Sequence, residues 1–343
     1  KNKVKIKKCF TRIKKKTWII ACHINEIKNR NDYKTINYYD ESVIIYNINN
    51  EFFAFKNVCV HRGSKIKIKK YGNEVFNCIY HGWTYNKDGV LISGPEIKKA
   101  FSKKQLENKK LLKMKVELCG NFIFVTDISN KQNLKNYLST HFNEIKKLSL
   151  RFGNLVSSKK YEWKCNWQIA IENSIDEYHG PILHKSTFKK ILKLEPKYSS
   201  SSKVSEMNMP LQNDYLKFFS DVLTKPYISI GKNYRHYFIF PISTIATTMD
   251  LFCYLQRYIP IDDNNSIIET DIFIPEIFIN NQDKTKFLVD SAIKFNEIIF
   301  NEDREICESI HYNSRSGYKY LNLGKFEKRI KFFKKLTKTF NFK

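Results

Sequence analysis

Two short segments, CVHRG and CIYHGW, constrain the fold of this chain more than any other part of its 343 residues. Cys59 and His61 lie two positions apart, Cys78 and His81 lie three apart, and sixteen residues separate the two pairs. Two thiols and two imidazoles on paired loops form a metal-ligand set. Zn²⁺ accepts such a set, and so does a [2Fe–2S] cluster with thiolates on one iron and imidazoles on the other. The segments therefore predict a metal centre of one of these two kinds.

The residues beside the two pairs favour the iron–sulfur cluster. Gly63 and Gly82 follow the two pairs, and glycine permits the tight loop backbone that such loops need. No helix is expected to carry the second pair, as a helix does in a zinc finger.

The chain divides into two regions with different patterns of hydrophobic residues. Residues 17–127 contain short strand-like runs between polar turns, the pattern of a small all-β domain. The runs are TWIIACH, SVIIYNI, EFFAFKNV, EVFNCIY, LLKMKVELC and NFIFVT. Residues 128–343 mix helical periodicity with strand-like runs, so an α+β domain is expected there. Residues 1–16 form a basic segment ahead of both domains, and the absence of an initiator Met fits a fragment or a processed chain.

Helices and strands of the second region can be placed from their periodicity. Helices are expected over 133–148, 165–179 and 284–313, with a basic helix closing the chain, and strands over 235–240, 251–260 and 266–275. The four serines at 199–202 indicate a mobile loop.

The stretch NSIDEYHGPILH, residues 173–184, carries a second candidate metal site. Asp176 and His179 are three residues apart, so a helix would place them on one face. Pro181 breaks such a helix, which lets His184 turn toward the same point from the segment beyond. Two neutral imidazoles that converge in this way suit iron, zinc or nickel.

Both sets of motifs resemble those of one family. NVCVHRG, CIYHGWTYNKDG and SGPE resemble the Rieske domain of the Rieske non-haem iron oxygenases, which include the alpha subunits of ring-hydroxylating oxygenases. NWQIAIENSIDEYHGPILH resembles the mononuclear iron motif of the same family, in the same order. The resemblance implies an α+β protein, with an all-β Rieske [2Fe–2S] domain at 17–127 and an α+β helix-grip (START-like) catalytic domain at 128–343.

The resemblance also implies a role for each candidate ligand. Cys59 and Cys78 would hold one iron of the cluster, and His61 and His81 the other. In the second domain, His179 and His184 would bind a mononuclear Fe(II) together with a carboxylate from FNEDREICESIH. Asp303 matches the family position of that carboxylate, and Glu302 is its rival.

Four further residues can be judged from the same resemblance. Asp176 matches the acid that connects the two metal centres, by contacting a cluster histidine of the next subunit in a head-to-tail homotrimer. Asn173 is expected to line the site. Gln168 and His311 depart from the family pattern, and His311 is expected to lie at the surface. No role is assigned to the histidines at 23, 141 and 236.

The cluster ligands and the mononuclear iron ligands together predict an oxygenase. Electrons from NAD(P)H would reach the cluster through a separate reductase or ferredoxin, because the chain has no G-x-G-x-x-G nucleotide fingerprint. They would pass to Fe(II), where oxygen from O₂ enters a small organic substrate by mono- or dioxygenation. One alternative is a Rieske-type electron-transfer protein without oxygenase activity, which the histidine pair disfavours. The other is a basic zinc protein that binds nucleic acid, which no base-reading motif supports.

Charge and composition bound the partners and the compartment. The net charge of +26 either reflects drift toward lysine codons or forms a basic surface for an acidic reductase or ferredoxin. Eight dispersed cysteines indicate reduced thiols and a cytoplasmic protein, and no apolar run reaches the ~20 residues of a membrane span. Neither nucleic acid nor membrane is therefore expected as a partner. The substrate pocket is expected among residues 200–280, where the sequence reveals no acidic or aromatic cage.

Overall fold

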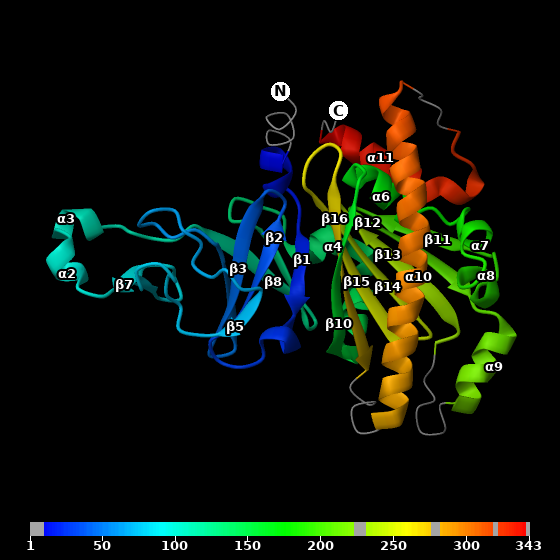
Figure 1. Ribbon diagram of the computed structural model, residues 1–343, viewed down its shortest axis with the longest axis horizontal. Helices are drawn as coiled ribbons and strands as arrows, with labels where there is room; N and C mark the ends of the chain where they lie inside the picture. Colours follow the sequence, from blue (N-terminus) through cyan, green and yellow to red (C-terminus); the bar gives the residue numbers. More distant parts are fainter. Residues whose placement is uncertain (1–9, 223–230, 276–281, 318–321, 341–343) are drawn as a thin grey trace. The chain divides into compact units, whose positions relative to one another are not determined.

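The computed structural model describes residues 10–222, 231–275, 282–317 and 322–340 (Figure 1). The chain forms two compact units, one from Phe10 to Leu134 and the other from Lys135 onward. Of the basic segment expected at 1–16, residues 1–9 lie outside the described ranges and residues 10–14 are helical. In the described ranges, no helix is both long and apolar enough to cross a membrane.

The first unit is built on a seven-stranded antiparallel sheet in the order β1-β9-β8-β4-β3-β2-β5. Its strands are β1 (Ile19–His23), β2 (Asp32–Tyr38), β3 (Glu41–Ile48), β4 (Glu51–Lys56), β5 (Tyr71–Asn73), β8 (Lys113–Cys119) and β9 (Phe122–Asp127). A small second sheet and short helices complete the unit: η1 (Ile24–Ile27), β6 (Thr84–Tyr85), β7 (Leu91–Ser93), α2 (Ile97–Ala100) and α3 (Lys103–Leu106). The expectation of an all-β domain is confirmed.

The sequence pattern was wrong about one strand of this unit and missed four others. Residues 74–80 form a loop with a single bridge between Asn77 and Thr84, although EVFNCIY reads as a strand. Val75 and Ile79 are 59% and 58% exposed, whereas Phe76 and Cys78 are buried in the core of the unit, so only part of this apolar segment enters the core. The missed strands are β2, β5, β6 and β7. Polar side chains hide the alternation of β2, and the other three are only two or three residues long.

The second unit holds another seven-stranded antiparallel sheet, in the order β10-β16-β15-β14-β13-β12-β11. The strands are β10 (Phe152–Trp163), β11 (Lys197–Ser201), β12 (Val204–Pro210), β13 (Asn233–Ile239), β14 (Ser243–Thr248), β15 (Phe252–Pro260) and β16 (Ser266–Pro275). The helices are α4 (Leu134–Leu138), η2 (Ser139–His141), α5 (Phe142–Arg151), α6 (Trp167–Ser174), α7 (Gly180–Leu183), α8 (Phe188–Ile191), α9 (Asn213–Val222), α10 (Gln282–Arg315), η4 (Lys325–Glu327) and α11 (Lys328–Thr339).

The long helix α10 crosses one face of this sheet and closes its core (Figure 1). Leu288 and Ala292 of α10 are fully buried and pack in one cluster with Met207, Tyr254 and Ile272 from the strands. On α11, Phe333 is likewise buried, and its ring contacts those of Trp167, Phe238 and Phe240. Helix α10 therefore packs on the strands, and α11 packs on both the sheet and α6.

Three expectations for this unit need correction. The helix expected over 133–148 is broken into α4, η2 and α5, and Ser139 at the break has a positive φ of 53°. The helix expected over 165–179 stops at Ser174. Of the serines at 199–202, the first three belong to strand β11, which pairs with β12, and Ser202 lies in the turn between these strands with a positive φ of 47°.

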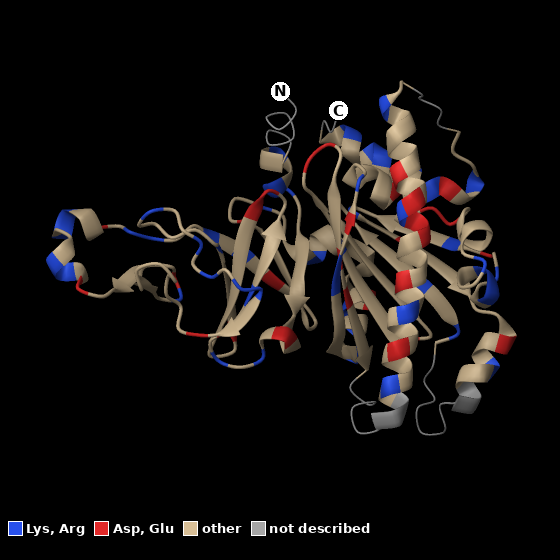
Figure 2. Ribbon diagram, in the orientation of Figure 1, with Lys and Arg blue, Asp and Glu red and all other residues tan. Residues whose placement is uncertain are grey.

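Basic side chains gather on particular helices of the described chain (Figure 2). On α11, Lys331, Lys335 and Lys338 are exposed and recur at helical spacing, which we term the α11 lysine face. In the first unit, lysines occupy both α2 and α3, at positions 98, 99, 103 and 104.

Candidate metal centres and substrate cavity

The two Cys/His loops of the first unit have the same backbone geometry. In each loop the cysteine N–H donates to the carbonyl five residues later, and a glycine N–H four residues later donates back to the cysteine carbonyl. These four bonds, between 2.8 and 3.0 Å, join Cys59 to Ser64, Gly63 to Cys59, Cys78 to Trp83, and Gly82 to Cys78. Both glycines have a positive φ, as the sequence predicted, because a side chain would strain this turn.

The side chains of these loops face a common point. The rings of His61 and His81 are 4.6 Å apart, and His61 also stacks on Trp83 at 4.5 Å. Cys59 and Cys78 are both buried. His61 Nδ1 is buried without a hydrogen-bond partner, an orphan that a metal would satisfy.

The four ligands do not form a site for one ion. A tetrahedral Zn²⁺ with bonds of about 2.0–2.3 Å needs its ligand atoms roughly 3–4 Å apart. Among the described residues, only His179, His184 and Asp303 place three or more such ligand atoms within 4.8 Å of one another. A two-iron cluster spreads its ligands across two metals, so the loops fit the cluster better than zinc.

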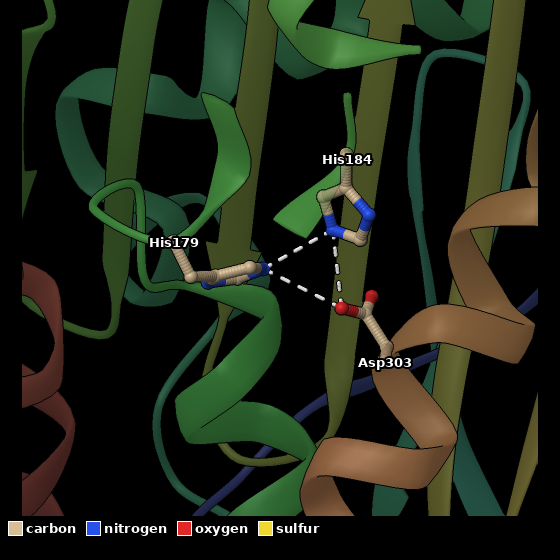
Figure 3. A group of neighbouring side chains, drawn as sticks. All are labelled: His179, His184 and Asp303. Atoms are coloured by element: carbon tan, nitrogen blue, oxygen red, sulfur yellow. Dashed lines mark hydrogen bonds and ion pairs between the residues drawn. The ribbon is translucent and has the colours of Figure 1, made fainter. Parts of the chain in front are cut away.

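Those three residues converge from two distant segments (Figure 3). His179 and His184 flank the one-turn helix α7, and Pro181 lies in its first turn, where proline is tolerated. Asp303 comes from the middle of α10. The Nε2 atoms of the two histidines are 3.2 Å apart, and Asp303 Oδ1 lies 3.4 Å from His179 Nε2 and 3.1 Å from His184 Nε2.

The arrangement fits a small divalent metal. Asp303 Oδ1 is buried and makes no well-formed hydrogen bond, although it faces both ring nitrogens. An anionic oxygen and two imidazole nitrogens directed at one point are the donor set that non-haem Fe(II) takes. The structure thus brings together the three residues that the sequence named.

A carboxylate behind each histidine fixes its orientation. Asp176 Oδ2 accepts from His179 Nδ1 at 3.1 Å, and Glu302 Oε2 accepts from His184 Nδ1 at 2.6 Å. Each bond holds a proton on Nδ1 and leaves Nε2 free for a metal. Glu302, the rival third ligand, therefore lies behind His184, and this geometry supports Asp303. Asp176 contacts His179 through a turn and not through the helix face that the spacing suggested.

The three groups polarise one another in the metal-free site. Burial alone would lower the pKa of His179, but the nearby carboxylates of Asp176 and Asp303 raise that pKa to about 9. Burial alone would raise the pKa of Asp303, but His179 and His184 lower it to about 2. The metal-free site is therefore an ion pair around pH 7.

A cavity of about 100 Å³ lies beside the three residues. Its walls come from strands β12–β15, as expected, but also from β10, α6 and α10. The sequence missed its aromatic character: Trp163, Phe188, Tyr234, Tyr254, Tyr258, Phe295 and Phe300 all line it. Asn173 lines it too, as predicted. No lysine or arginine is among its lining residues.

Several lining residues carry no sequence signal. His236, to which the sequence assigned no role, and Gln256 reach the cavity from β13 and β15. Each lies next to an arginine in its strand, Arg235 and Arg257, and only the pairing of the strands reveals that it faces the cavity. His311, expected at the surface, is 8% exposed and its Nε2 lies 3.2 Å from Asn264 Oδ1.

Comparison with known proteins identifies the class of the chain. Residues 17–117 match the Rieske [2Fe–2S] domain, and residues 154–339, more than half of the chain, match the catalytic domain of ring-hydroxylating alpha subunits. The chain belongs to the ring-hydroxylating alpha subunit family and carries a Rieske domain, as the motifs predicted.

Individual relatives are distant. A glycine betaine monooxygenase oxygenase subunit of Pseudomonas aeruginosa is 28% identical over 180 residues, which cover 52% of this chain and 41% of that protein. The chloroplastic choline monooxygenase of Beta vulgaris is 25% identical over 318 residues, covering 87% of this chain and 66% of that protein. The chain spans less than two thirds of the length of either relative.

Solved structures share the fold. A quaternary ammonium Rieske monooxygenase superposes with a TM-score of 0.80 at 20% identity, covering 97% of this chain and 91% of the other. A naphthalene 1,2-dioxygenase superposes with a TM-score of 0.71 at 21% identity, covering 92% and 79%. The predicted fold class is confirmed.

The positions of the two acids predict different effects on metal binding. Asp303→Ala should lower the affinity of the metal-free second unit for Co²⁺ at least a hundredfold, because it removes a ligand. Glu302→Ala should lower it by about 10–100-fold, as loss of a group that orients a ligand does. Titration followed by the visible absorption of Co²⁺ measures both. The reverse order would show that Glu302 is the ligand.

The raised pKa of His179 predicts a pH dependence. A metal binds the neutral imidazole, so below pH of about 9 it must displace the proton. We expect Co²⁺ affinity to rise roughly tenfold per pH unit between about pH 7 and 8.5, whereas a histidine with an ordinary pKa of about 6.5 would give a flat profile there. Asp176→Asn should flatten the profile, because it removes a carboxylate that raises this pKa. A profile flat in both proteins would contradict the assignment.

Proposed function

We propose that the chain is the terminal oxygenase component of a Rieske-type system, which inserts oxygen from O₂ into a small organic substrate. The observation that carries this proposal is the convergence of His179, His184 and Asp303 beside a cavity, in a chain that also has a Rieske domain. A plain electron-transfer protein would need neither the three residues nor the cavity.

The proposed residue roles follow the geometry. Cys59, Cys78, His61 and His81 would hold the [2Fe–2S] cluster, which supplies single electrons. His179, His184 and Asp303 would hold Fe(II), which supplies the chemistry of O₂ activation when bound. The protein contributes binding and orientation: the cavity would hold the substrate, and the carboxylates of Asp176 and Glu302 each hold one imidazole in place.

The cavity supports a small substrate. A dry cavity of about 150 Å³ accommodates benzene, so a space of about 100 Å³ that is partly open limits the substrate to about one ring or a short-chain ammonium compound. Aromatic walls without lysine or arginine suit a neutral or cationic molecule. Relatives named for choline and for glycine betaine are consistent with a cation, and the naphthalene enzyme with an apolar ring.

The partners are also proposals. An acidic reductase or ferredoxin would deliver electrons from NAD(P)H, and the α11 lysine face and the lysines of α2 and α3 offer complementary charge. A homotrimer would cover the apolar side chains beside the cluster loops, since Val58, Ile79 and Tyr80 are 46–58% exposed in the single chain. A cytoplasmic location remains a prediction from the cysteines.

Metal content and O₂ consumption test the proposal together. Anaerobically reconstituted protein should contain two irons and two sulfides for the cluster and one iron for the three-residue site. With a reductase and NADH, a panel of neutral and cationic compounds should include one that accelerates O₂ uptake with matching product. His184→Ala should retain the cluster but lose the third iron and the O₂ uptake. Two irons in the unmodified protein would favour the electron-transfer alternative.

Asp176 is the proposed connection between the two centres. Asp176→Asn should keep both metals but slow electron transfer from the reduced cluster to the mononuclear iron at least a hundredfold, because the charged acceptor of the His179 proton is lost. Stopped-flow reoxidation of the cluster by O₂, on protein of verified iron content, measures the rate. Asn173→Ala, a matched change in the cavity wall, should leave this rate within a few-fold. An unchanged rate in Asp176→Asn would remove the main support for the trimer.

A further inference from the structure

One wall of the cavity is a continuous hydrogen-bonded strip that the metal site does not use. Arg329, from α11, donates through Nη2 to His236 Nδ1 at 2.9 Å. His236 Nε2 lies 3.4 Å from Ser174 Oγ, and both of these residues line the cavity. Beyond them, the Tyr258 hydroxyl donates to Gln256 Oε1 at 3.1 Å on the same wall.

The contact with Arg329 determines where His236 carries its proton. A guanidinium has only donors, so Nδ1 must accept with its lone pair. The ring is therefore neutral and its single proton lies on Nε2, the atom on the side of Ser174. Burial and the nearby Arg329 charge both hold the pKa of His236 well below its usual value, which agrees with a neutral ring. His236 is thus a fixed donor in the cavity wall.

The only hydrogen bond available to this donor is poor. At 3.4 Å, the contact with Ser174 is long for an N–H···O bond, whose usual range is about 2.7–3.2 Å. Within the described chain His236 has no other acceptor on Nε2. A ligand oxygen in the cavity would supply a better one.

The charge of the strip decides which kind of oxygen fits. Arg329 is 2% exposed, and Glu177 neutralises it through an Nη1–Oε1 contact of 2.6 Å. None of the described residues that line the cavity is lysine or arginine, and three of them are the acids Asp176, Glu177 and Asp303. A ligand carboxylate beside His236 would be a buried anion without a counter-charge, which is strongly unfavourable. A hydroxyl or carbonyl oxygen meets no such penalty.

We propose that His236 Nε2–H donates to an uncharged oxygen of the substrate, so that the cavity selects a hydroxyl- or carbonyl-bearing molecule over its carboxylate and oxygen-free counterparts. This inference rests on the proposed function and narrows its substrate class. His236 would contact the substrate directly, and Arg329 would act through it as a positioning residue.

Binding to the metal-loaded protein under anaerobic conditions tests this selection without turnover. Two matched ligand sets serve as probes in calorimetric titrations: choline, propyltrimethylammonium and glycine betaine; and benzyl alcohol, ethylbenzene and benzoate. In at least one set the alcohol should bind about three- to tenfold more tightly than the oxygen-free member, the usual contribution of one hydrogen bond. The carboxylate should be the weakest. The proposal would be overturned if the carboxylate bound most tightly. It would also be overturned if, in both sets, the alcohol failed to bind or bound no more tightly than the oxygen-free member.

Variants assign the preference to His236. His236→Phe should abolish the preference for the alcohol and leave the affinity of the oxygen-free member within about twofold, whereas His236→Gln, which can still donate, should restore part of it. His141→Phe is a matched control, because His141 is equally buried at 4% exposure but does not line the cavity. Should His236→Phe fail to fold, the comparison of ligands on the unmodified protein still decides. Iron content and O₂ uptake, measured separately, show whether the proposed function stands when this selection fails.

Discussion

The site depends on the attraction between one buried carboxylate and two imidazoles. Asp303 lies on α10, and the two histidines lie more than a hundred residues earlier, so only the tertiary fold brings them together. A carboxylate buried without such partners would be strongly destabilising. The packing of α10 against the sheet and α6 must therefore be rigid enough to hold Oδ1 within 3.4 Å of both nitrogens. The large apolar cluster that contains Leu288 and Ala292 provides that rigidity, because these residues lie earlier on the same helix as Asp303.

The sequence predicted the parts of this site that are local. Each Cys/His loop and the His179–His184 pair lie within a few residues, so their spacing alone restricts the geometry. Asp303 could be named only through its resemblance to a family position, because a single acid on a basic helix has no distinguishing spacing. His236, Gln256 and Arg329 could not be found in either way: each comes from a different element, and only strand pairing and helix docking bring them to one wall.

The errors in the fold have related physical causes. EVFNCIY contains apolar residues that are exposed at a loop, so hydrophobicity suggested a strand that the loop backbone does not form. The serines of β11 pair fully with β12, although their composition suggested a mobile loop, because strand pairing depends on the partner as much as on intrinsic preference. Helix α6 ends five residues early, and this ending is what frees Asp176 and His179 to meet across a turn.

The charge of the whole chain and the charge of the cavity have different causes. A net charge of +26 is spread over exposed helices, where codon drift and partner binding would both leave lysines. The absence of lysine from the cavity is by itself weak evidence, because lysine is rarely buried anywhere. Arg329 is more informative, because it is a buried cation beside the cavity whose charge Glu177 cancels while its donors orient His236. An arginine placed to bind a substrate carboxylate would keep its charge free. This one is used to build a neutral wall, and a neutral wall is suited to substrates that carry no negative charge.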